Sequence, residues 1–416
     1  MRLTERRTER DGAGVNHPGW AWLGFALAAA FVATAAILNG ASLFAVSGYD
    51  SYALQAQAWR SGMTHLPDNL PHLELAVFNG EYYVSFPPVP TLPIWALQWV
   101  MPDGAPSGLL TVVYLLLCYP VAYCIGRRHV SALASATLAS LALVGGSFLD
   151  VGVSGGGFSG GVWYQAQALG LLLTLCAFHG VPGPGKARRF FGWLAIALAV
   201  GCRPFQGIYI PFLVWARRQA DPPDDRDAVV WFAQDVLPYW IAPAMAAGAM
   251  GWYNWVRFGS PLEFGHNYLP EFTRAGQTQF ALRHIPVNLF RILRPPFVDY
   301  PYDAPGAPFP LTLGFAVYFT QPMLADASTS LIRRDPDTGD RLLLGALVIH
   351  LALLLSHRTF GGWQYGARYI CDMLPGLLVL RLRSRREPGL PERVFLLVLA
   401  GFNLAGTVAF HAYSGH

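Results

Sequence analysis

Residues 20–44 read WAWLGFALAAAFVATAAILNGASLF, a stretch that contains no charged side chain. A helix needs roughly 20 apolar residues to cross a hydrocarbon core of about 30 Å, so this stretch is long enough to span a bilayer. It is also longer than the apolar region of roughly 7 to 15 residues in a secretory signal. No small-residue cleavage site follows it. We therefore expect a retained first span and not a cleaved signal peptide.

The same pattern recurs along the whole chain. Hydrophobic residues make up 53% of the 416 residues and charged residues only 13%, which is typical of a membrane protein and excludes an ordinary soluble domain. Further spans are expected at 107–126, 129–149, 161–180, 190–216, 228–252, 304–325, 342–357, 368–381 and 394–416. With 190–216 counted as two short helices, we predict an all-α polytopic integral membrane protein of about eleven transmembrane helices.

Basic residues indicate how these spans are oriented, because Arg and Lys beside short loops stay in the cytoplasm. Most of the 29 basic residues fall into six clusters. They are Arg2, Arg6, Arg7 and Arg10; Arg127 and Arg128; Lys186, Arg188 and Arg189; Arg217, Arg218 and Arg226; Arg333, Arg334 and Arg341; and Arg381, Arg383, Arg385, Arg386 and Arg393. These clusters predict a cytoplasmic N-terminus.

Residues 190–216 decide the orientation of everything that follows. They could form one span with Arg203 at its centre, or two short helices broken at Arg203-Pro204. A single span would place fewer basic residues in the cytoplasm, and both flanks of the segment are basic. We therefore predict the hairpin, with Arg203 near the outer surface or in a water-filled cavity.

The hairpin leaves two long loops on the outer face, 45–106 and 253–305, and places the C-terminus outside. We divide the chain into a cytoplasmic tail, 1–19, and a single transmembrane domain, 20–416. The expected location is a bacterial plasma membrane. Long loops in a compact fold usually carry function, so the site is sought there. No GxxxxGK[ST] occurs, and we expect no nucleic acid partner.

The first outer loop carries a recognisable order of elements. Asp50 directly follows the first span, and 51–61 reads as a short amphipathic helix on the membrane surface. Asp50 could be no more than the N-cap of that helix. Residues 73–86 alternate around Asn79-Gly80, which predicts a β-hairpin with a type I′ turn. Prolines from Pro87 to Pro93 then lead into a helix, ending near 101, that is too short to span.

These features resemble the GT-C superfamily of membrane glycosyltransferases: a surface Asp after the first span, a Gly-x-Tyr-Tyr hairpin, a Pro-Pro pair and a short helix. Three later segments agree with this resemblance. They are Cys202-Arg203-Pro204; Tyr253-Asn254-Trp255-Val256-Arg257-Phe258-Gly259-Ser260-Pro261; and Gly361-Gly362-Trp363-Gln364-Tyr365-Gly366-Ala367-Arg368-Tyr369. The resemblance runs in order from about residue 20 to about residue 380.

The resemblance implies transfer of a sugar from a polyprenyl-phosphate-linked donor to an acceptor on the outer face, in contact with membrane lipids. A carboxylate must take the proton of the acceptor hydroxyl, and Asp50 is the candidate base. Arginine offers planar paired donors to phosphate oxygens, and Arg203, Arg358 and Arg368 lie at the outer ends of predicted spans. Asp372 follows Arg368 by four residues, and the two are expected to form an ion pair.

Asp150 corresponds by position to a second loop acid of several GT-C enzymes. With Asp50 and Glu81 it could bind a divalent metal ion through oxygen ligands, or it could orient a substrate hydroxyl. Alternatively, Asp150 only starts the glycine-rich stretch 145–161, and Glu81 only lies on the hairpin surface. No Asp-x-Asp follows the first span within the outer loop 45–106, so no cofactor is required by the sequence.

The remaining candidates lie in the outer loops. Tyr82, Tyr83 and His266 are candidate substrate-binding residues. Five arginines of the second outer loop lie among aromatic residues and could contact an anionic lipid or glycan. They are Arg257, Arg274, Arg283, Arg291 and Arg294. In contrast to larger GT-C members, this chain is expected to contact its acceptor through the loop 253–305 or through a partner.

Two other function classes stay open. A many-span glycan polymerase or ligase also places arginines beside a long outer loop, but the hairpin and Pro-Pro pair do not belong to that pattern. A lipid or small-molecule transporter should show internal repeats and ionisable residues near the bilayer midplane. Here the notable charges lie at the outer edge, and no repeat is visible. The acceptor, the sugar and the oligomeric state do not follow from the sequence.

Overall fold

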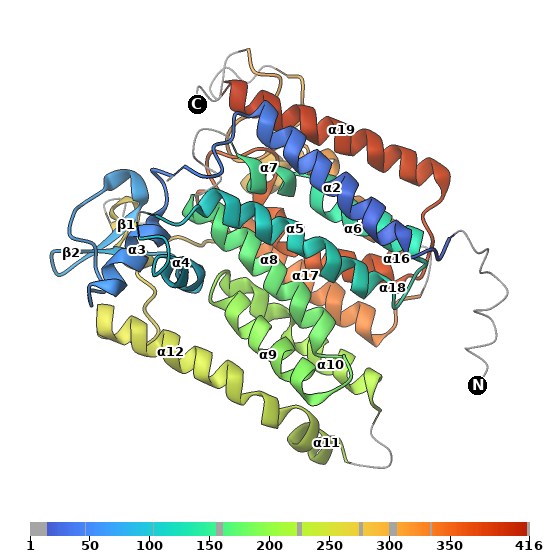
Figure 1. Ribbon diagram of the computed structural model, residues 1–416, viewed down its shortest axis with the longest axis horizontal. Coiled ribbons are helices and arrows are strands. Elements are labelled where there is room, and N and C mark those ends of the chain that lie inside the picture. The colour runs from blue at the N-terminus through green and yellow to red at the C-terminus, as the bar shows by residue number, and fades with distance from the viewer. Residues whose placement is uncertain are drawn as a thin grey trace.

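The computed structural model describes residues 15–45, 47–102, 104–154, 161–222, 227–273, 278–298, 306–332 and 335–413 (Figure 1). Several predicted features lie outside the described residues: Arg2, Arg6, Arg7, Arg10, Arg226, Arg274, Arg333 and Arg334, part of the glycine-rich stretch 145–161, and the end of the loop 253–305.

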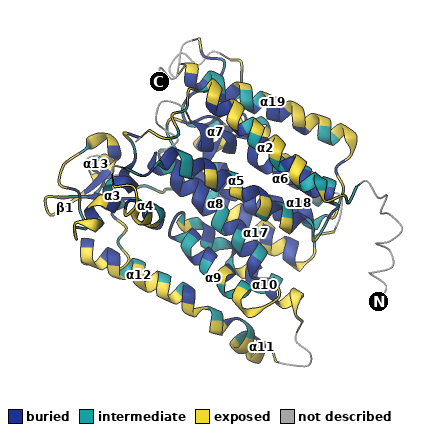
Figure 2. Cartoon of the chain, viewed as in Figure 1, coloured by how far each residue is buried: buried dark blue, intermediate teal, exposed yellow. Residues whose placement is uncertain are grey.

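The fold is predominantly helical, and its centre is a layer of packed apolar helices. Its main helices are α2 (Gly19–Leu38), α5 (Ser107–Gly126), α6 (Ala132–Val144), α8 (Val162–Gly180), α9 (Lys186–Val200), α10 (Ile210–Ala220), α12 (Ile241–Phe258), α16 (Pro322–Ile332), α17 (Thr338–Leu355), α18 (Leu374–Arg383) and α19 (Leu390–Tyr413). Buried residues concentrate on α5, α8 and α18, whereas α12 and α19 expose much of their surface (Figure 2).

Four of the described helices are long and apolar enough to cross a membrane by length and composition alone. They are α2, α5, α17 and α19. Several other predicted spans are formed by shorter helices in sequence, such as α6 followed by α7 (Phe148–Val153). The number of eleven spans therefore stays a prediction.

The predicted reversal at Arg203-Pro204 is present. Helix α9 ends before it, and the chain continues through the 3-10 helix η3 (Pro204–Tyr209) into α10. Arg189, near the start of α9, lies 3.7 Å from Asp221, just after α10. A single continuous helix would hold these residues tens of ångströms apart at about 1.5 Å per residue. The two helices are thus a hairpin with its turn at Arg203.

The first outer loop folds as a small unit against the end of the helical layer. It contains α3 (Ser51–Arg60), η1 (Pro71–Leu73), β1 (Leu75–Phe78), β2 (Glu81–Val84) and α4 (Thr91–Leu97). The strands pair antiparallel with Leu75 opposite Val84 and Phe78 opposite Glu81. Asn79 and Gly80 both have positive φ, 52° and 85°, which is the type I′ geometry predicted from Asn-Gly.

Helix α3 is not the surface helix that its amphipathic pattern predicted. Gln55, expected on its polar face, is buried, donates a 2.8 Å hydrogen bond to the phenol oxygen of Tyr253, and accepts one of 2.5 Å from Thr91. Polar residues satisfied by neighbours can be buried, so the sequence pattern misassigned this face. The helix packs against α4 and is hydrogen-bonded to Tyr253 of α12.

Two predicted spans have different bounds. Residues 306–316 of the span 304–325 are not helical, and helix occurs only in α15 (Val317–Thr320) and α16. Pro308 and Pro310 disfavour helix here, and Leu313 and Ala316 have positive φ. The span 228–252 is divided into α11 (Ala228–Asp235), the 3-10 turn η4 (Leu237–Tyr239) and α12, with the break at Pro238.

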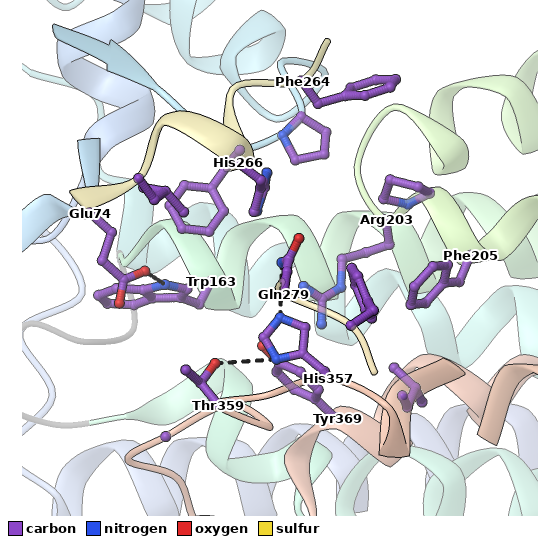
Figure 3. Close-up of a pocket in the computed structure, with 18 of the residues that line it drawn as sticks. Glu74, Trp163, Arg203, Phe205, Phe264, His266, Gln279, His357, Thr359 and Tyr369 are labelled. Carbon is purple, nitrogen blue, oxygen red and sulfur yellow. Dashed lines mark hydrogen bonds between the residues drawn. The ribbon is translucent and has the colours of Figure 1, made fainter. Parts of the chain in front are cut away.

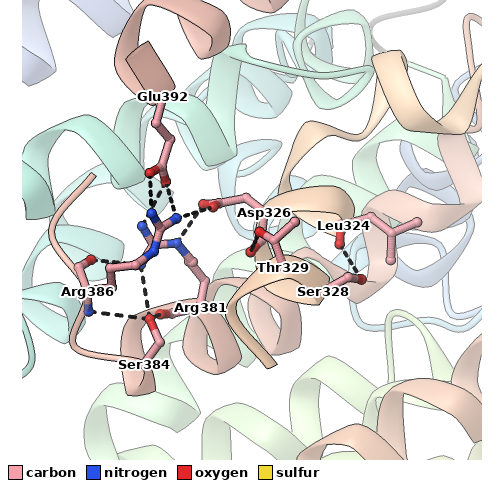
Figure 4. A network of polar contacts seen from close by, with 8 residues as sticks. All are labelled: Leu324, Asp326, Ser328, Thr329, Arg381, Ser384, Arg386 and Glu392. Atoms are coloured by element: carbon pink, nitrogen blue, oxygen red, sulfur yellow. Dashed lines mark hydrogen bonds and ion pairs between the residues drawn. The ribbon is translucent and has the colours of Figure 1, made fainter. Parts of the chain in front are cut away.

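Ion pairs connect three helices at the end of the layer that carries the basic cluster at 381–393 (Figure 4). Arg381 of α18 is fully buried and contacts Asp326 of α16 at 2.7 Å and Glu392 of α19 at 2.9 Å. Arg386 contacts the same two acids. Part of the basic cluster that indicated orientation is therefore neutralised within the fold.

Candidate functional site

A cavity of about 620 Å³ opens where the first outer loop meets the helical layer. Its walls come from the hairpin (Glu74, Phe86), the start of α8 (Trp163, Tyr164), the α9–η3 break, the segments 262–272 and 279–280, and the segment 354–372 (Figure 3). The lining is mostly apolar, with charged groups at a few places. Such a concave, largely apolar site with few polar groups is typical of a ligand-binding site.

Arg368 is the most distinctive group in this cavity. It begins the 3-10 helix η6 (Arg368–Met373), and its side chain is 3% exposed. Its guanidinium carbon lies 4.9 Å from the ring centroid of Tyr164 and 5.4 Å from that of Tyr369. Nη2 donates to the carbonyl of Gly361 at 3.5 Å, but Nε and Nη1 have no hydrogen-bond partner among the described residues. A buried arginine with two free donors is costly unless an anion meets it.

Glycines in the preceding segment give Arg368 this position. Gly361 has a φ of 86° and Gly366 a φ of 60°, in the left-handed region that glycine adopts without strain. A Cβ on Gly366 would lie 2.7 Å from the Cβ of Thr320. The Gly-Gly-x-x-Tyr-Gly-x-Arg-Tyr segment is thus needed for a tight turn that packs against α15.

Arg203 also lines the cavity, but it is neutralised. Its Nε and Nη2 both lie 2.8 Å from Oδ2 of Asp372, and Gln167 donates to the other carboxylate oxygen at 2.7 Å. The expected Arg368–Asp372 ion pair is therefore wrong. Residues 368–373 form a 3-10 helix, in which residues three apart share a face and residues four apart do not.

The aromatic ring of Tyr369 contacts both arginines. The guanidinium carbons of Arg203 and Arg368 each lie 5.4 Å from its ring centroid. The aromatic face stabilises both cations without neutralising them. Because Asp372 neutralises Arg203, Arg368 is the remaining cation of the two that can bind a ligand.

Carboxylates and histidines line other parts of the cavity. Glu74, whose Oε2 accepts a 3.2 Å hydrogen bond from the indole of Trp163, has its pKa raised because the cavity walls partly desolvate it. Burial lowers the pKa of His266 to about 4, so it is neutral at pH 7. His357 contacts Gln279 at 2.9 Å and Thr359 at 3.2 Å (Figure 3).

Glu74 and His357 were not identified from the sequence, in which only their positions beside predicted site segments were a signal. Glu74 is the first acid of the stretch 73–86, and it adopts φ 53°, a left-handed conformation unusual for glutamate. His357 directly precedes Arg358. Their convergence depends on contacts between distant segments, which no local pattern reports.

Asp50 lies beside the cavity and not among its lining residues. It caps α3, since its Oδ1 accepts from the backbone N–H of Ala53 at 3.0 Å and from Gln165 at 2.9 Å. Burial raises the pKa of this carboxyl to about 6. Gln165 follows Trp163 and Tyr164, so Asp50 is behind the wall that these residues form.

Asp150 is fully buried within α7 and does not begin a surface loop. Its Oδ1 lies 3.1 Å from Nε2 of His411 in α19. Arg358 lies at the cavity's edge, 5.8 Å from the ring of Phe272, and donates to the carbonyl of Glu271 at 3.4 Å.

Three hairpin residues that were predicted for the site do not line the cavity. Glu81 contacts His65 at 3.3 Å, Tyr82 forms a bridge with Leu66, and Tyr83 packs against Phe258. Of the predicted site residues, the structure thus brings Arg203, Arg368 and His266 together around one cavity. Among the described residues, no three His, Cys, Asp or Glu side chains form a group that could hold a metal ion.

Two arginines of the second outer loop are structural and do not form the surface predicted for them. Arg257 is buried, stacks 4.1 Å from the ring centroid of Tyr253, and donates to the carbonyl of Val84 at 2.9 Å. Arg294 donates to the carbonyl of Gly314 at 2.9 Å. These contacts attach the hairpin to α12 and the segment 306–316 to α14 (His284–Leu293).

Two solved structures are similar to this chain. One is ArnT from Cupriavidus metallidurans in the apo state, with 13% identity over 88% of this chain and 59% of that chain, and a TM-score of 0.51. The other is the oligosaccharyltransferase AglB from Archaeoglobus fulgidus in complex with an inhibitory peptide and a dolichol-phosphate, with 15% identity over 95% of this chain and 56% of that chain, and a TM-score of 0.54. Both are GT-C superfamily glycosyltransferases. The chain has a GT-C-like fold.

This GT-C-like chain spans 59% and 56% of the lengths of those two proteins. Its sequence matches no protein-family model and no curated protein sequence. The apolar helices and the two similar structures identify it as a multi-pass membrane protein.

Proposed function

We propose that this chain is a glycosyltransferase that moves a sugar from a polyprenyl-phosphate-linked donor to an acceptor on the outer face of a bacterial plasma membrane. Its N-terminus is cytoplasmic and its C-terminus is outside in this proposal, as the basic clusters predict. The acceptor meets the cavity from the side of the outer loops.

The observation that carries the proposal is Arg368. Its donors Nε and Nη1 have no partner among the described residues, and each forms a two-donor edge of the guanidinium together with Nη2, whose bond to the Gly361 carbonyl is long at 3.5 Å. A phosphate offers oxygens in the planar geometry that such a fork matches. The neighbouring Arg203 is already held by Asp372, so one phosphate group is enough to balance the remaining charge.

The apolar part of the cavity suits a lipid-linked donor. Leu262, Phe264 and Phe280 are exposed apolar residues that line it, and exposed apolar surface of this kind is favourable beside a hydrocarbon chain. The archaeal AglB structure contains a dolichol-phosphate, which is a ligand of this chemistry.

The proposed reaction forms one bond and breaks one. The acceptor hydroxyl oxygen attacks the anomeric carbon, the bond from that carbon to the phosphate oxygen breaks, and its electron pair stays on the phosphate beside Arg368. A carboxylate takes the hydroxyl proton. We propose Asp50 as this base. The geometry offers Glu74 as a second candidate, because it lines the cavity whereas Asp50 lies behind its wall.

The purified chain, given a panel of polyprenyl-phosphate sugars in detergent, tests this proposal. We expect one donor to release free polyprenyl phosphate together with formation of a glycosylated acceptor or of free sugar. A transporter would bind or move a donor in vesicles without cleaving it. Binding or movement of a donor with no cleavage across the panel would contradict the glycosyltransferase assignment.

A further inference from the structure

Two arginines meet at one histidine at the end of the helical layer opposite the cavity. Arg128 follows α5, Arg188 lies in the first turn of α9, and His179 lies in the last turn of α8. Nη2 of Arg128 lies 3.2 Å from Nδ1 of His179 and donates to its carbonyl oxygen at 2.7 Å. Nη2 of Arg188 contacts Nε2 of the same imidazole.

The two ring contacts cannot both be hydrogen bonds. A guanidinium only donates, and an imidazole offers one acceptor nitrogen when neutral and none when protonated. At least one arginine therefore faces an N–H group or another cation. In the part of the chain that the structure describes, neither Arg128 nor Arg188 forms an ion pair with a carboxylate. Among the described residues, the cluster therefore has more hydrogen-bond donors than acceptors.

The start of α9 adds to this excess of donors. Gly185, its N-cap residue, provides no side-chain hydrogen bond, and the first turn contains no acid. Helix N-termini favour negative charge, yet this one carries Lys186, Arg188 and Arg189. Arg189 is paired with Asp221 and Asp235, at 3.7 and 3.9 Å, whereas Lys186 is exposed. An anion placed here would meet both the cations and the free backbone N–H groups.

We propose that Arg128, Arg188 and the start of α9 bind a phosphate group. The ligand presents a phosphate oxygen that accepts hydrogen bonds from both guanidiniums in place of the imidazole. Helix α8 has 19 residues, about 28 Å at roughly 1.5 Å per residue, so this site lies about one hydrocarbon thickness from the cavity. The phosphate therefore belongs to an anionic lipid headgroup of the predicted inner leaflet or to a soluble phosphate compound. This site is independent of the transferase assignment.

Melting temperatures of the full purified chain in neutral detergent, at constant ionic strength, test this site. The probes are phosphatidylglycerol mixed into the micelles, phosphatidylcholine as the zwitterionic control, and inorganic phosphate against chloride. We expect saturable stabilisation by an anionic probe, because a ligand that binds only the folded state stabilises it. Stabilisation by phosphatidylglycerol alone identifies a lipid headgroup, and stabilisation by inorganic phosphate identifies a soluble ligand.

The variant R128Q/R188Q should weaken the apparent affinity for the active probe by at least about tenfold, since it removes both charge-assisted donors. The matched control is R218Q/R341Q, which removes two exposed arginines outside the cluster. A third variant, Arg188→Lys, keeps the charge and loses the planar fork, and it decides the matter if the double variant does not fold. The proposal is overturned if no anionic probe stabilises the wild-type chain. It is also overturned if the control loses as much affinity as the cluster variant, or if neither R128Q/R188Q nor Arg188→Lys weakens binding.

Discussion

At the scale of single residues, one substitution separates the capping role of Asp50 from its proposed role as the base. Asn caps a helix about as well as Asp, so Asp50→Asn should leave the melting temperature near the wild-type value at pH 7. Asn cannot take a proton, and loss of a general base typically costs ~10² to 10⁴ in rate. The measurement is turnover at saturating donor. Turnover within a few-fold of wild type would leave Asp50 as a cap, and Glu74→Gln would then be the variant expected to lose activity.

The raised pKa of Asp50 gives this prediction a pH signature. Its folded pKa is about 6 against an ordinary value of 3.8, so the folded state holds the proton more tightly than the unfolded state. The resulting stability is fully present below about pH 4 and is lost as pH rises through about 6, by roughly 3 kcal/mol at most. Activity should rise over the same interval as the base deprotonates. Asp50→Asn should abolish both trends.

The ion pair between Asp372 and Arg203 leads to a second prediction at this scale. Asp372→Asn or Arg203→Gln alone leaves a buried charge without its partner, which typically costs about 3 to 5 kcal/mol. The double variant removes both charges and should lose clearly less stability than the sum of the single variants. Thermal melting of the three variants in detergent measures this coupling. Additive losses would show that the pair does not act as a unit.

The residues predicted from the sequence differ in how far geometry supports them. Arg203 and Arg368 were identified by motif, and His266 was proposed from its place in the second outer loop. All three line one cavity. Asp150 was placed by position alone and is buried against His411. Glu74 was missed because its neighbours, Trp163 among them, come from distant parts of the chain.

At the scale of elements, the Tyr-Asn-x-x-x-Phe segment of α12 holds the outer unit in place. The phenol oxygen of Tyr253 accepts from Gln55 at 2.8 Å and from Trp59 at 3.2 Å, both on α3. Tyr253→Phe leaves two buried donors unsatisfied and should destabilise the protein by about 1 to 3 kcal/mol. Hydrogen exchange of 51–60 should increase more than that of 162–180. Tyr318→Phe is the control, since that ring is 37% exposed.

Equal exchange in both segments would contradict the anchoring role of Tyr253.

Elements with strong local signals were predicted correctly, such as the hairpin around Asn79-Gly80. The span 304–325 was misjudged because apolar composition was weighed above Pro308 and Pro310. Helix α3 was misjudged because tertiary contacts bury its polar side chain Gln55.

At the scale of the whole molecule, the α9–α10 hairpin sets the orientation of half the chain. Single cysteines at the exposed positions Ala187 and Gln219, in a background without the native five, should both be shielded from a membrane-impermeant thiol reagent in intact cells. A cysteine at exposed Asn69 in the first outer loop should be labelled. Labelling of only one of the first two positions would contradict the predicted topology.

The central claim is that the cavity binds the phosphate of a polyprenyl donor through Arg368. Its most direct test is the Kd of a short-chain polyprenyl phosphate for the wild-type chain, for Arg368→Lys and for the exposed control Arg341→Lys. Lysine is a point charge that cannot reproduce the paired donors of the guanidinium. We predict at least about tenfold weaker binding for Arg368→Lys with its fold retained, and unchanged binding for Arg341→Lys. Equal affinity of Arg368→Lys and the wild-type chain would contradict the account.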